Sequence, residues 1–563
     1  MTTRAPELAP AQAPQTDRAR KAWLWAAIVA AIVLMYVVYW RESWTVGANS
    51  DSASTALQAW DVLHGNTLLH GWWMSDVSFY TTEIPQYVIL EAIFGLGPAV
   101  VHIAAAMTYT LIVVFAALLA KGRARGTEGL VRALLAATVA MSPQMSASLT
   151  YLLGPDHTGT MVPVLATWLV IDRVPKTAPG ARWYMPAVVA VLIAWIMTAD
   201  SIVLFAAIAP LVITAAIRAG GAIVRRGERL AGKVYELSLA VGALAGAWVG
   251  DQMPRVIAHF GGYTVWHFQT RTVPLSHLGS SAWDTTQAVL MLLGADIFSA
   301  SSGVELVLIW LHLAGVLAAL AGLLIALRRF FSEETLVMPA LAIAIMLETG
   351  AFLVSIHSTN LDSVRELVPV MPFGAVLAGR MMAAPLLRGL NAARLGTARL
   401  GTVRLGTVRL GTVRLGTVLI PALAVVAAGY LGSMVYGATR PSAPTVNQSL
   451  ADWLTEHHLT SGLAGYWEAG SVTLNTGGRI LVSGVKQSGG WVGQYDWETQ
   501  KSQYDPTLHD PTFVVVSAPP VDPPVKGLPA AAIKTFGKPA GVYHIPGYTI
   551  MVWHKNLLVR MSR

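Results

Sequence analysis

The chain has 563 residues, of which 54% are hydrophobic and 12% charged, and its mean hydropathy is +0.54. A soluble domain of this size carries about twice that fraction of charged residues, so the composition is that of a polytopic membrane protein. The absence of cysteine excludes disulfides and thiolate chemistry. The formal net charge of +8 gives no support to nucleic-acid binding.

The first apolar segment follows a Pro- and Ala-rich start and the basic residues Arg18, Arg20 and Lys21. It is long, and no small-residue cleavage site follows it, so we interpret it as an uncleaved anchor. Apolar windows of roughly 17 to 25 residues indicate membrane spans. The sequence predicts eleven spans, at about 22–40, 98–120, 130–148, 158–172, 184–199, 201–217, 237–250, 303–327, 335–355, 366–380 and 417–437.

The segment 41–97, between the first two spans, mixes carboxylates with many aromatic residues. From Ser52 its apolar residues recur every three to four positions, which predicts an amphipathic helix. Asp51 stands at the N-terminal edge of this helix, where Ser50, Asp51 or Ser52 is expected to cap free backbone N–H groups. The apolar piece 85–94 is too short to span, so we expect a helix lying at the membrane interface.

The distribution of basic residues predicts the orientation of the chain. With the N-terminus inside, the inner segments hold 25 Lys and Arg, whereas the outer loops hold four. The positive-inside rule therefore places residues 1–21 in the cytoplasm and, after an odd number of spans, the C-terminus outside. Most acidic loop residues then face outward, so we expect the chemistry on the outer face.

We place the helical bundle at 22–437. Two segments differ from it in composition, one inserted within this range and one following it. In 381–416 the pentapeptide RLGTV is repeated almost without change, and we interpret the repeats as a basic cytoplasmic linker, with a contact to anionic lipid headgroups as the alternative. Residues 438–563 contain β-rich runs such as RILVSGV and a helical stretch at 449–457. They predict an extracytoplasmic α/β domain large enough to fold as a unit.

Two acidic residues of the first outer loop are candidates for catalysis. Asp51 is either a helix cap or a general base, which needs a carboxylate held close to the hydroxyl that it deprotonates. Glu83 precedes Pro85 at the start of the short helix, where a carboxylate also favours the helix N-terminus without any catalytic role.

Two further motifs stand at the outer edges of later spans. Asp156 and His157 precede the fourth span and are candidates for helix capping, phosphate contact or a divalent metal, although a stable metal site usually needs three or more protein ligands. Arg365 opens the tenth span, where it is either an interfacial side chain or a phosphate-binding group. No motif for a soluble cofactor is present.

Several of these features together resemble the GT-C membrane glycosyltransferases, in particular bacterial relatives of the protein O-mannosyltransferases and of the aminoarabinose lipid A transferases. The resemblance rests on the early Asp51, the amphipathic helix ending before Gly65, the EIPQY element and the RELVPVMP segment. The tail motifs GYWEAG and GYTIMVWHKNLL are similar to the outer domains of actinobacterial members. Ser52 follows Asp51 where many relatives have Glu, which weakens a metal role for this loop.

The resemblance implies an all-α GT-C-like bundle of about eleven transmembrane helices in the bacterial plasma membrane, with the C-terminal domain outside. It implies transfer of a sugar from a polyprenyl-phosphate donor to a hydroxyl of a lipid, polysaccharide or protein acceptor, with inversion. Asp51 matches the family's catalytic aspartate and Glu83 its second acidic position. Arg365 matches a basic residue that binds the lipid phosphate, and Asp156 the acidic residue before the fourth span. His157 departs from the family pattern, and we consider it as a second group for the donor phosphate beside Arg365.

Two rival functions remain open from the sequence. A transporter or lipid flippase predicts repeated, Gly/Pro-broken spans with ionisable residues near the midplane, and we find no convincing repeat. A non-catalytic scaffold would bind cell-wall glycan through aromatic residues of the outer domain, although these residues also suit the core of a small domain. They are Trp467, Trp491, Trp497 and Tyr495.

Overall fold

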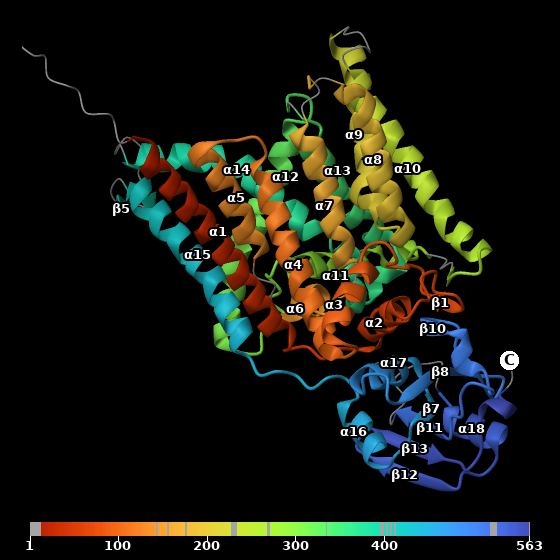
Figure 1. The fold of residues 1–563 in the computed structure, drawn as a ribbon. Helices are drawn as coiled ribbons and strands as arrows, with labels where there is room; N and C mark the ends of the chain where they lie inside the picture. Colours follow the sequence, from red (N-terminus) through yellow and green to blue (C-terminus); the bar gives the residue numbers. More distant parts are fainter. Residues whose placement is uncertain are drawn as a thin grey trace, which may run out of the picture.

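The computed structural model describes residues 13–141, 145–154, 157–174, 177–178, 180–226, 233–266, 271–333, 335–394, 399–400, 404–405, 408–409, 413–517 and 526–561. Helices form one body, and a smaller domain with a β-sheet lies at one end of it (Figure 1). The predicted division into an all-α bundle and a C-terminal α/β domain is confirmed.

Eleven long helices in the described part of the chain follow the predicted spans in order. They are α1 (Ala13–Ser43), α4 (Pro98–Lys121), α5 (Gly126–Ala140), α7 (Thr158–Arg173), α8 (Ala181–Ala199), α9 (Ala209–Arg226), α10 (Val234–His259), α12 (Gly303–Arg328), α13 (Val337–Val354), α14 (Val370–Arg394) and α15 (Leu415–Thr439). Among the described residues, eight helices are long and apolar enough to cross a membrane, judged by length and composition. Of the eleven helices that correspond to predicted spans, α5, α7 and α10 do not meet these criteria of length and composition.

Shorter helical elements connect the long ones. A π-helical turn, η1 (Leu204–Ile208), opens the helix that continues as α9, and π-helical turns are frequent at functional sites. The remaining elements of the bundle are α6 (Met145–Tyr151), η3 (Leu275–His277), α11 (Leu278–Leu292), η4 (Ile356–Thr359) and η5 (Leu361–Leu367).

The first outer loop contains two helices and one strand. The amphipathic helix is α2 (Ser50–Leu63), and the short apolar helix is α3 (Ile84–Phe94). Strand β1 (Trp72–Met74) lies between them in a three-stranded sheet, pairing with β2 (Thr264–Val265) and with β10 (Thr499–Gln500) of the C-terminal domain. The loop is therefore joined to the C-terminal domain by backbone pairing.

The C-terminal domain has a six-stranded mixed sheet in the order β12-β13-β11-β7-β8-β9. Strand β11 (Phe513–Ser517) is buried throughout: Val514 and Val516 belong to one hydrophobic cluster, Phe513 and Val515 to another. A strand covered on both faces is uniformly apolar rather than alternating. The other elements are α16 (Gln448–Glu456), β7 (Ser461–Ala464), α17 (Tyr466–Asn475), β8 (Leu481–Ser488), β9 (Trp491–Gln494), η6 (Lys501–Tyr504), α18 (Leu528–Phe536), β12 (Gly541–Ile545), β13 (Tyr548–Val552) and η8 (Leu558–Arg560).

The RLGTV repeats are only partly described. Two short antiparallel pairs occur in them, between β3 (Arg399–Leu400) and β6 (Val413–Arg414), and between β4 (Arg404–Leu405) and β5 (Val408–Arg409). The described repeat residues therefore have extended backbone, between the end of α14 and the start of α15.

A buried ion pair ties α7 to α14, at the end of α7 away from the first loop. Nη1 of Arg380 lies 2.9 Å from Oδ1 of Asp172, whose side chain is fully buried. The same guanidinium nitrogen donates to the carbonyl of Leu119, at the end of α4. Three helices thus converge on one charged contact, where a loss of either partner leaves a buried charge.

Candidate active site

Asp51 lies in the first turn of α2, and a neighbouring residue performs the capping. Oδ1 of Asn49 accepts from the backbone N–H of Ser52 at 3.1 Å, and the Ser52 hydroxyl oxygen accepts from the N–H of Asn49. Of the expected capping residues Ser50, Asp51 and Ser52, only Ser52 caps a backbone N–H, and the N-cap itself is Asn49. Because Asn49 satisfies the helix end, the Asp51 carboxylate is available for other contacts.

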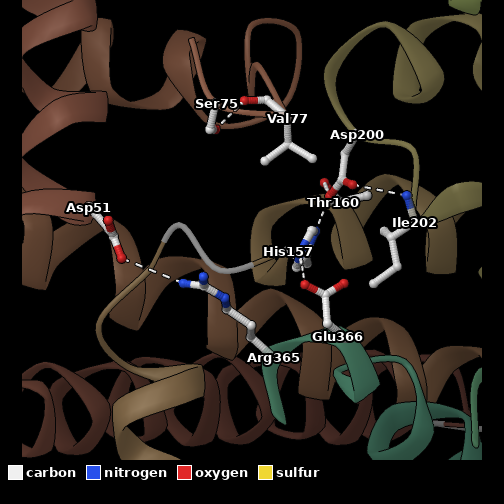
Figure 2. Close-up of polar contacts among 9 residues, drawn as sticks. All are labelled: Asp51, Ser75, Val77, His157, Thr160, Asp200, Ile202, Arg365 and Glu366. Carbon is white, nitrogen blue, oxygen red and sulfur yellow. Dashed lines mark hydrogen bonds and ion pairs between the residues drawn. The ribbon is translucent and has the colours of Figure 1, made fainter. Parts of the chain in front are cut away.

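Two side chains from distant parts of the chain reach this carboxylate. Nη1 of Arg365, in η5, lies 3.5 Å from Oδ2 of Asp51 (Figure 2). The hydroxyl of Tyr466, the first residue of α17, donates to Oδ1 at 2.6 Å. The bundle, the first loop and the C-terminal domain thus each contribute one side chain to this contact.

His157 lies in a second group of charged residues beside the first. Its Nδ1 is 2.8 Å from Oδ2 of Asp200, and its Nε2 is 3.6 Å from Oε1 of Glu366 (Figure 2). Asp200 also accepts from the Thr160 hydroxyl and from the backbone N–H of Ile202. Both ring nitrogens therefore face a carboxylate, and Asp200 serves as a helix cap and as the partner of His157.

The two carboxylates set the charge of His157. Burial alone lowers the pKa of the imidazole, but Asp200 and then Glu366 raise the pKa well above its usual value of 6.5. The ring is consequently held as a cation, which donates from both nitrogens.

These groups line two adjoining cavities. The larger has a volume of about 550 Å³ and the smaller about 210 Å³. Asp51, Arg365 and Tyr466 line the smaller cavity. Both cavities share the residues Asp76, Val77, His157, His357 and Glu366. Their combined size falls within the range of small-molecule sites, which is about 300 to 1,000 Å³.

The larger cavity is rich in carboxylates, which sequence reasoning largely missed as a group. Its acidic lining residues are Asp76, Asp200, Asp251, Glu348 and Glu366. No local pattern brings them together, because they lie in separate loops and helices.

Glu83, the second acidic candidate of the first loop, does not line the cavity that Asp51 lines. Its side chain is buried, accepts a hydrogen bond from the Thr82 hydroxyl, and is absent from the described lining of both cavities. Burial raises the pKa of Glu83 to about 8. A Cβ added at Gly159 would lie 2.4 Å from Oε1 of Glu83, so the carboxyl packs against the start of α7. Glu83 thus lies behind the start of α7, within electrostatic reach of Asp200 and His157.

The C-terminal domain also contributes residues that the sequence did not single out. Glu498 lines the smaller cavity, and its carboxylate accepts from the hydroxyl of Ser54, the amide of Gln58 and the backbone N–H of Ser75. Tyr466 lies in the GYWEAG motif that carries part of the family resemblance, which was the available signal for it. Glu498 follows a tryptophan in an irregular loop, where no periodic pattern marks it.

The three candidate tryptophans lie apart. Trp497 lines the smaller cavity beside Asp51. Trp467 and Trp491 are 38% and 45% exposed, so neither is a core residue of the domain as the alternative interpretation held. The ammonium of Lys534 lies 4.4 Å from the ring centroid of Trp491, a cation–π contact.

Asp156, the candidate supporting or metal-binding residue, lies outside the described residues. Within the described ranges there is no group of three or more His, Asp or Glu side chains arranged to hold a metal ion.

No family model and no curated protein sequence matches the chain. Solved structures do. ArnT from Cupriavidus metallidurans in the apo state has a TM-score of 0.54 at 15% identity, over 97% of this chain and 100% of that chain. The same protein bound to undecaprenyl phosphate has a TM-score of 0.52 at 14% identity, over 94% and 98%. The archaeal oligosaccharyltransferase AglB from Archaeoglobus fulgidus, in complex with an inhibitory peptide and a dolichol-phosphate, has a TM-score of 0.47 at 12% identity, over 92% and 73%.

The similarity to ArnT extends over nearly the whole of both chains, including the bundle, the first loop and the C-terminal domain. At this sequence identity it identifies the fold. The protein is a multi-pass membrane protein that shares the fold of ArnT, a helical bundle with a C-terminal domain as the sequence resemblance implied.

Proposed function

We propose that the protein is a membrane glycosyltransferase that moves a sugar from a polyprenyl-phosphate donor to an acceptor hydroxyl, with inversion. The observation that carries the proposal is the Asp51 carboxylate 3.5 Å from the Arg365 guanidinium at a cavity in a GT-C fold. A base for the acceptor and a cation for the leaving phosphate then line one cavity, and a single displacement would place the anomeric carbon between the acceptor oxygen and the phosphate.

In this reaction Asp51 acts as the general base. It takes the proton of the acceptor hydroxyl while that oxygen forms a bond to the anomeric carbon from the face opposite the leaving group. The bond between the anomeric carbon and the phosphate oxygen breaks, and its electron pair leaves with the polyprenyl phosphate. A general base of this kind contributes about 10²- to 10⁴-fold to the rate.

Arg365, with His157, stabilises the departing phosphate. The Arg365 side chain is 43% exposed beside the smaller cavity, so its guanidinium can present several N–H donors to phosphate oxygens. His157, held as a cation, lines the same cavity. Fixed cations stabilise charge that develops on the leaving group without reorganisation during the reaction.

The donor class is supported by the ArnT structure that contains undecaprenyl phosphate. The outward-facing location is supported by the distribution of 25 inner against four outer basic residues. Orientation with the N-terminus in the cytoplasm puts Asp51, Arg365 and the C-terminal domain on the outer face of the plasma membrane. The acceptor is then a lipid, polysaccharide or protein of the cell envelope.

Consumption of the donor in proteoliposomes tests the proposal. Wild type is supplied with polyprenyl-phosphate mannose and related lipid-linked sugars, and release of polyprenyl phosphate is measured beside Asp51→Asn. We expect release by wild type and its loss in the variant. Asp452→Asn, at an exposed carboxylate of α16, is the matched control. Asp51→Asn protein that is folded and retains most of the turnover would contradict the role of Asp51, and no release by wild type with any donor would contradict the function.

A further inference from the structure

We propose that Tyr466 of the C-terminal domain is a positioning residue for Asp51: it fixes the carboxylate through Oδ1 and leaves Oδ2 as the basic oxygen that faces the acceptor. This inference rests on the proposed transferase function and adds a role for the C-terminal domain in the chemical step. It is carried by the 2.6 Å hydrogen bond from the Tyr466 hydroxyl to Oδ1 and by the separate contact of Oδ2 with Arg365.

The two oxygens of Asp51 have different surroundings. Oδ1 accepts from a phenol that is 8% exposed, whereas Oδ2 lies at 3.5 Å from a half-exposed guanidinium. A short hydrogen bond to a carboxylate is charge-assisted and restricts its rotation. The weaker contact at Oδ2 is the one that an entering acceptor and phosphate can replace. Tyr466 thus selects which oxygen meets the substrate.

Tyr466 acts as the donor in this contact. Burial raises the pKa of its hydroxyl well above the usual value of 10.0, and the Asp51 and Glu498 carboxylates raise it further. The phenol therefore keeps its proton and donates it in the hydrogen bond to the Asp51 carboxylate.

The helix that carries Tyr466 is held against the helix that carries Asp51. A Cβ added at Gly470 would lie 3.5 Å from Cβ of Ala53, so α17 approaches α2 closely at this glycine. The Ser50 hydroxyl donates to the carbonyl of Trp467 at 2.8 Å, directly beside both functional residues. Figure 1 shows α17 at the side of the C-terminal domain that faces α2.

A second attachment prevents the C-terminal domain from moving away. Glu498 bonds to α2 and to the first loop, and the neighbouring β10 pairs with β1. The backbone N–H of Lys501 also donates to the carbonyl of Gly71 at 2.8 Å. With contacts at α17 and at β10, the position of Tyr466 relative to Asp51 is determined at two separate points.

The test compares Tyr466→Phe with wild type in the proteoliposome transfer assay. Loss of one charge-assisted hydrogen bond to the base should lower kcat by about 10- to 100-fold, with the KM for the donor changed by less than about twofold. The acid limb of the pH–rate profile should move to higher pH, because the ionised carboxylate loses a donor. Tyr504→Phe is the matched control: its hydroxyl is also buried and donates to the carbonyl of Gly484, within the same domain.

The outcomes separate this inference from the proposed function. If Tyr466→Phe keeps the wild-type kcat and pH profile, the inference is wrong while the transferase function stands. If wild type itself releases no polyprenyl phosphate, both are wrong. An equal loss in Tyr504→Phe would indicate a general effect of domain packing and would contradict the specific role.

A variant that keeps the shape of the ring covers the case in which Tyr466→Phe fails to fold. Fluorinated tyrosine introduced at position 466 keeps the hydrogen bond but makes the phenol a stronger donor. The acid limb should then move to lower pH as fluorine atoms are added. A profile that does not respond to fluorination would overturn the inference.

Discussion

Nδ1 of His157 lies 2.8 Å from Oδ2 of Asp200, and this contact joins the start of α7 to the end of α8. His157 has a φ of +61°, a left-handed conformation that costs a non-glycine residue about 1 to 3 kcal/mol. Both of its ring nitrogens face carboxylates, which compensate for this strain. The pair therefore fixes the start of α7 at the junction of the two cavities.

The stability of this contact should depend on pH. The pKa of His157 in the folded protein is raised above 6.5, so its ion pairs stabilise the fold fully below that value and are lost as pH rises through the raised pKa. Thermal unfolding in detergent should show wild type losing stability from neutral to alkaline pH, and Asp200→Asn losing less. His259→Gln, at an exposed residue near the end of α10, should follow wild type. Parallel curves for wild type and Asp200→Asn would contradict the assignment.

Arg365 should matter more for turnover than for folding. Removal of a fixed charge from a developing anion lowers the rate by about 10²- to 10³-fold, so we expect a loss of this order for Arg365→Gln. Arg365→Lys should retain part of the activity, because it keeps the charge without the planar fork. The melting temperature should change little, since the side chain is 43% exposed. Arg329→Gln, which removes an exposed arginine from a 4.0 Å pair with Glu333, is the control.

The buried pair of Asp172 and Arg380, in contrast to Arg365, should matter for the free energy of folding. Asp172→Ala leaves the Arg380 guanidinium buried without its carboxylate, which costs about 3 to 5 kcal/mol of folding free energy. Replacement of both by apolar residues, as in Asp172→Leu with Arg380→Met, should recover much of that loss. Denaturant titration of the purified protein measures both effects. Asp251→Ala, in the exposed pair with Arg255, should change the free energy by about 1 kcal/mol or less.

Glu498 should control the attachment of the C-terminal domain to the first loop. Glu498→Leu removes the acceptor for Ser54, Gln58 and the Ser75 N–H, so backbone amides of α2 and β1 should exchange hydrogen faster. Mass spectrometry of peptides from the first loop measures this exchange. Asp496→Asn, which weakens a partly exposed pair with Lys486, is the matched control. Unchanged exchange in Glu498→Leu would show that the β-pairing and the contacts of α17 with α2 hold the domain without Glu498.

Features set by local sequence were predicted well. Runs of apolar residues marked the membrane helices and the short helix α3, and periodicity marked α2, because membrane burial and amphipathic packing act on neighbouring residues. At the start of α2 the capping role of Ser52 was among the expectations but Asn49 was missed, since several adjacent polar residues satisfy the same preference and only backbone geometry distinguishes them.

Contacts made over long sequence distances were not predicted. Tyr466 meets Asp51 across 415 residues, and Glu498 meets Ser54 across 444. Such contacts follow from the packing of folded elements and leave no periodic signal in either segment. The resemblance nevertheless indicated Asp51 and Arg365, and the motif before the fourth span indicated His157. The structure brings all three to one cavity.

The pairing of β1 with β10 also has a consequence for how the molecule is made. Gln500 donates to the carbonyl of His70 from a position 430 residues later in the chain. A nascent chain therefore exposes the edge of β1 that pairs with β10 throughout synthesis of the bundle. All the helices of the bundle are made before β10 exists. Assembly of the first loop is in this way delayed until the polypeptide is almost complete, so a prematurely terminated product would carry Asp51 without the hydrogen bond from Tyr466.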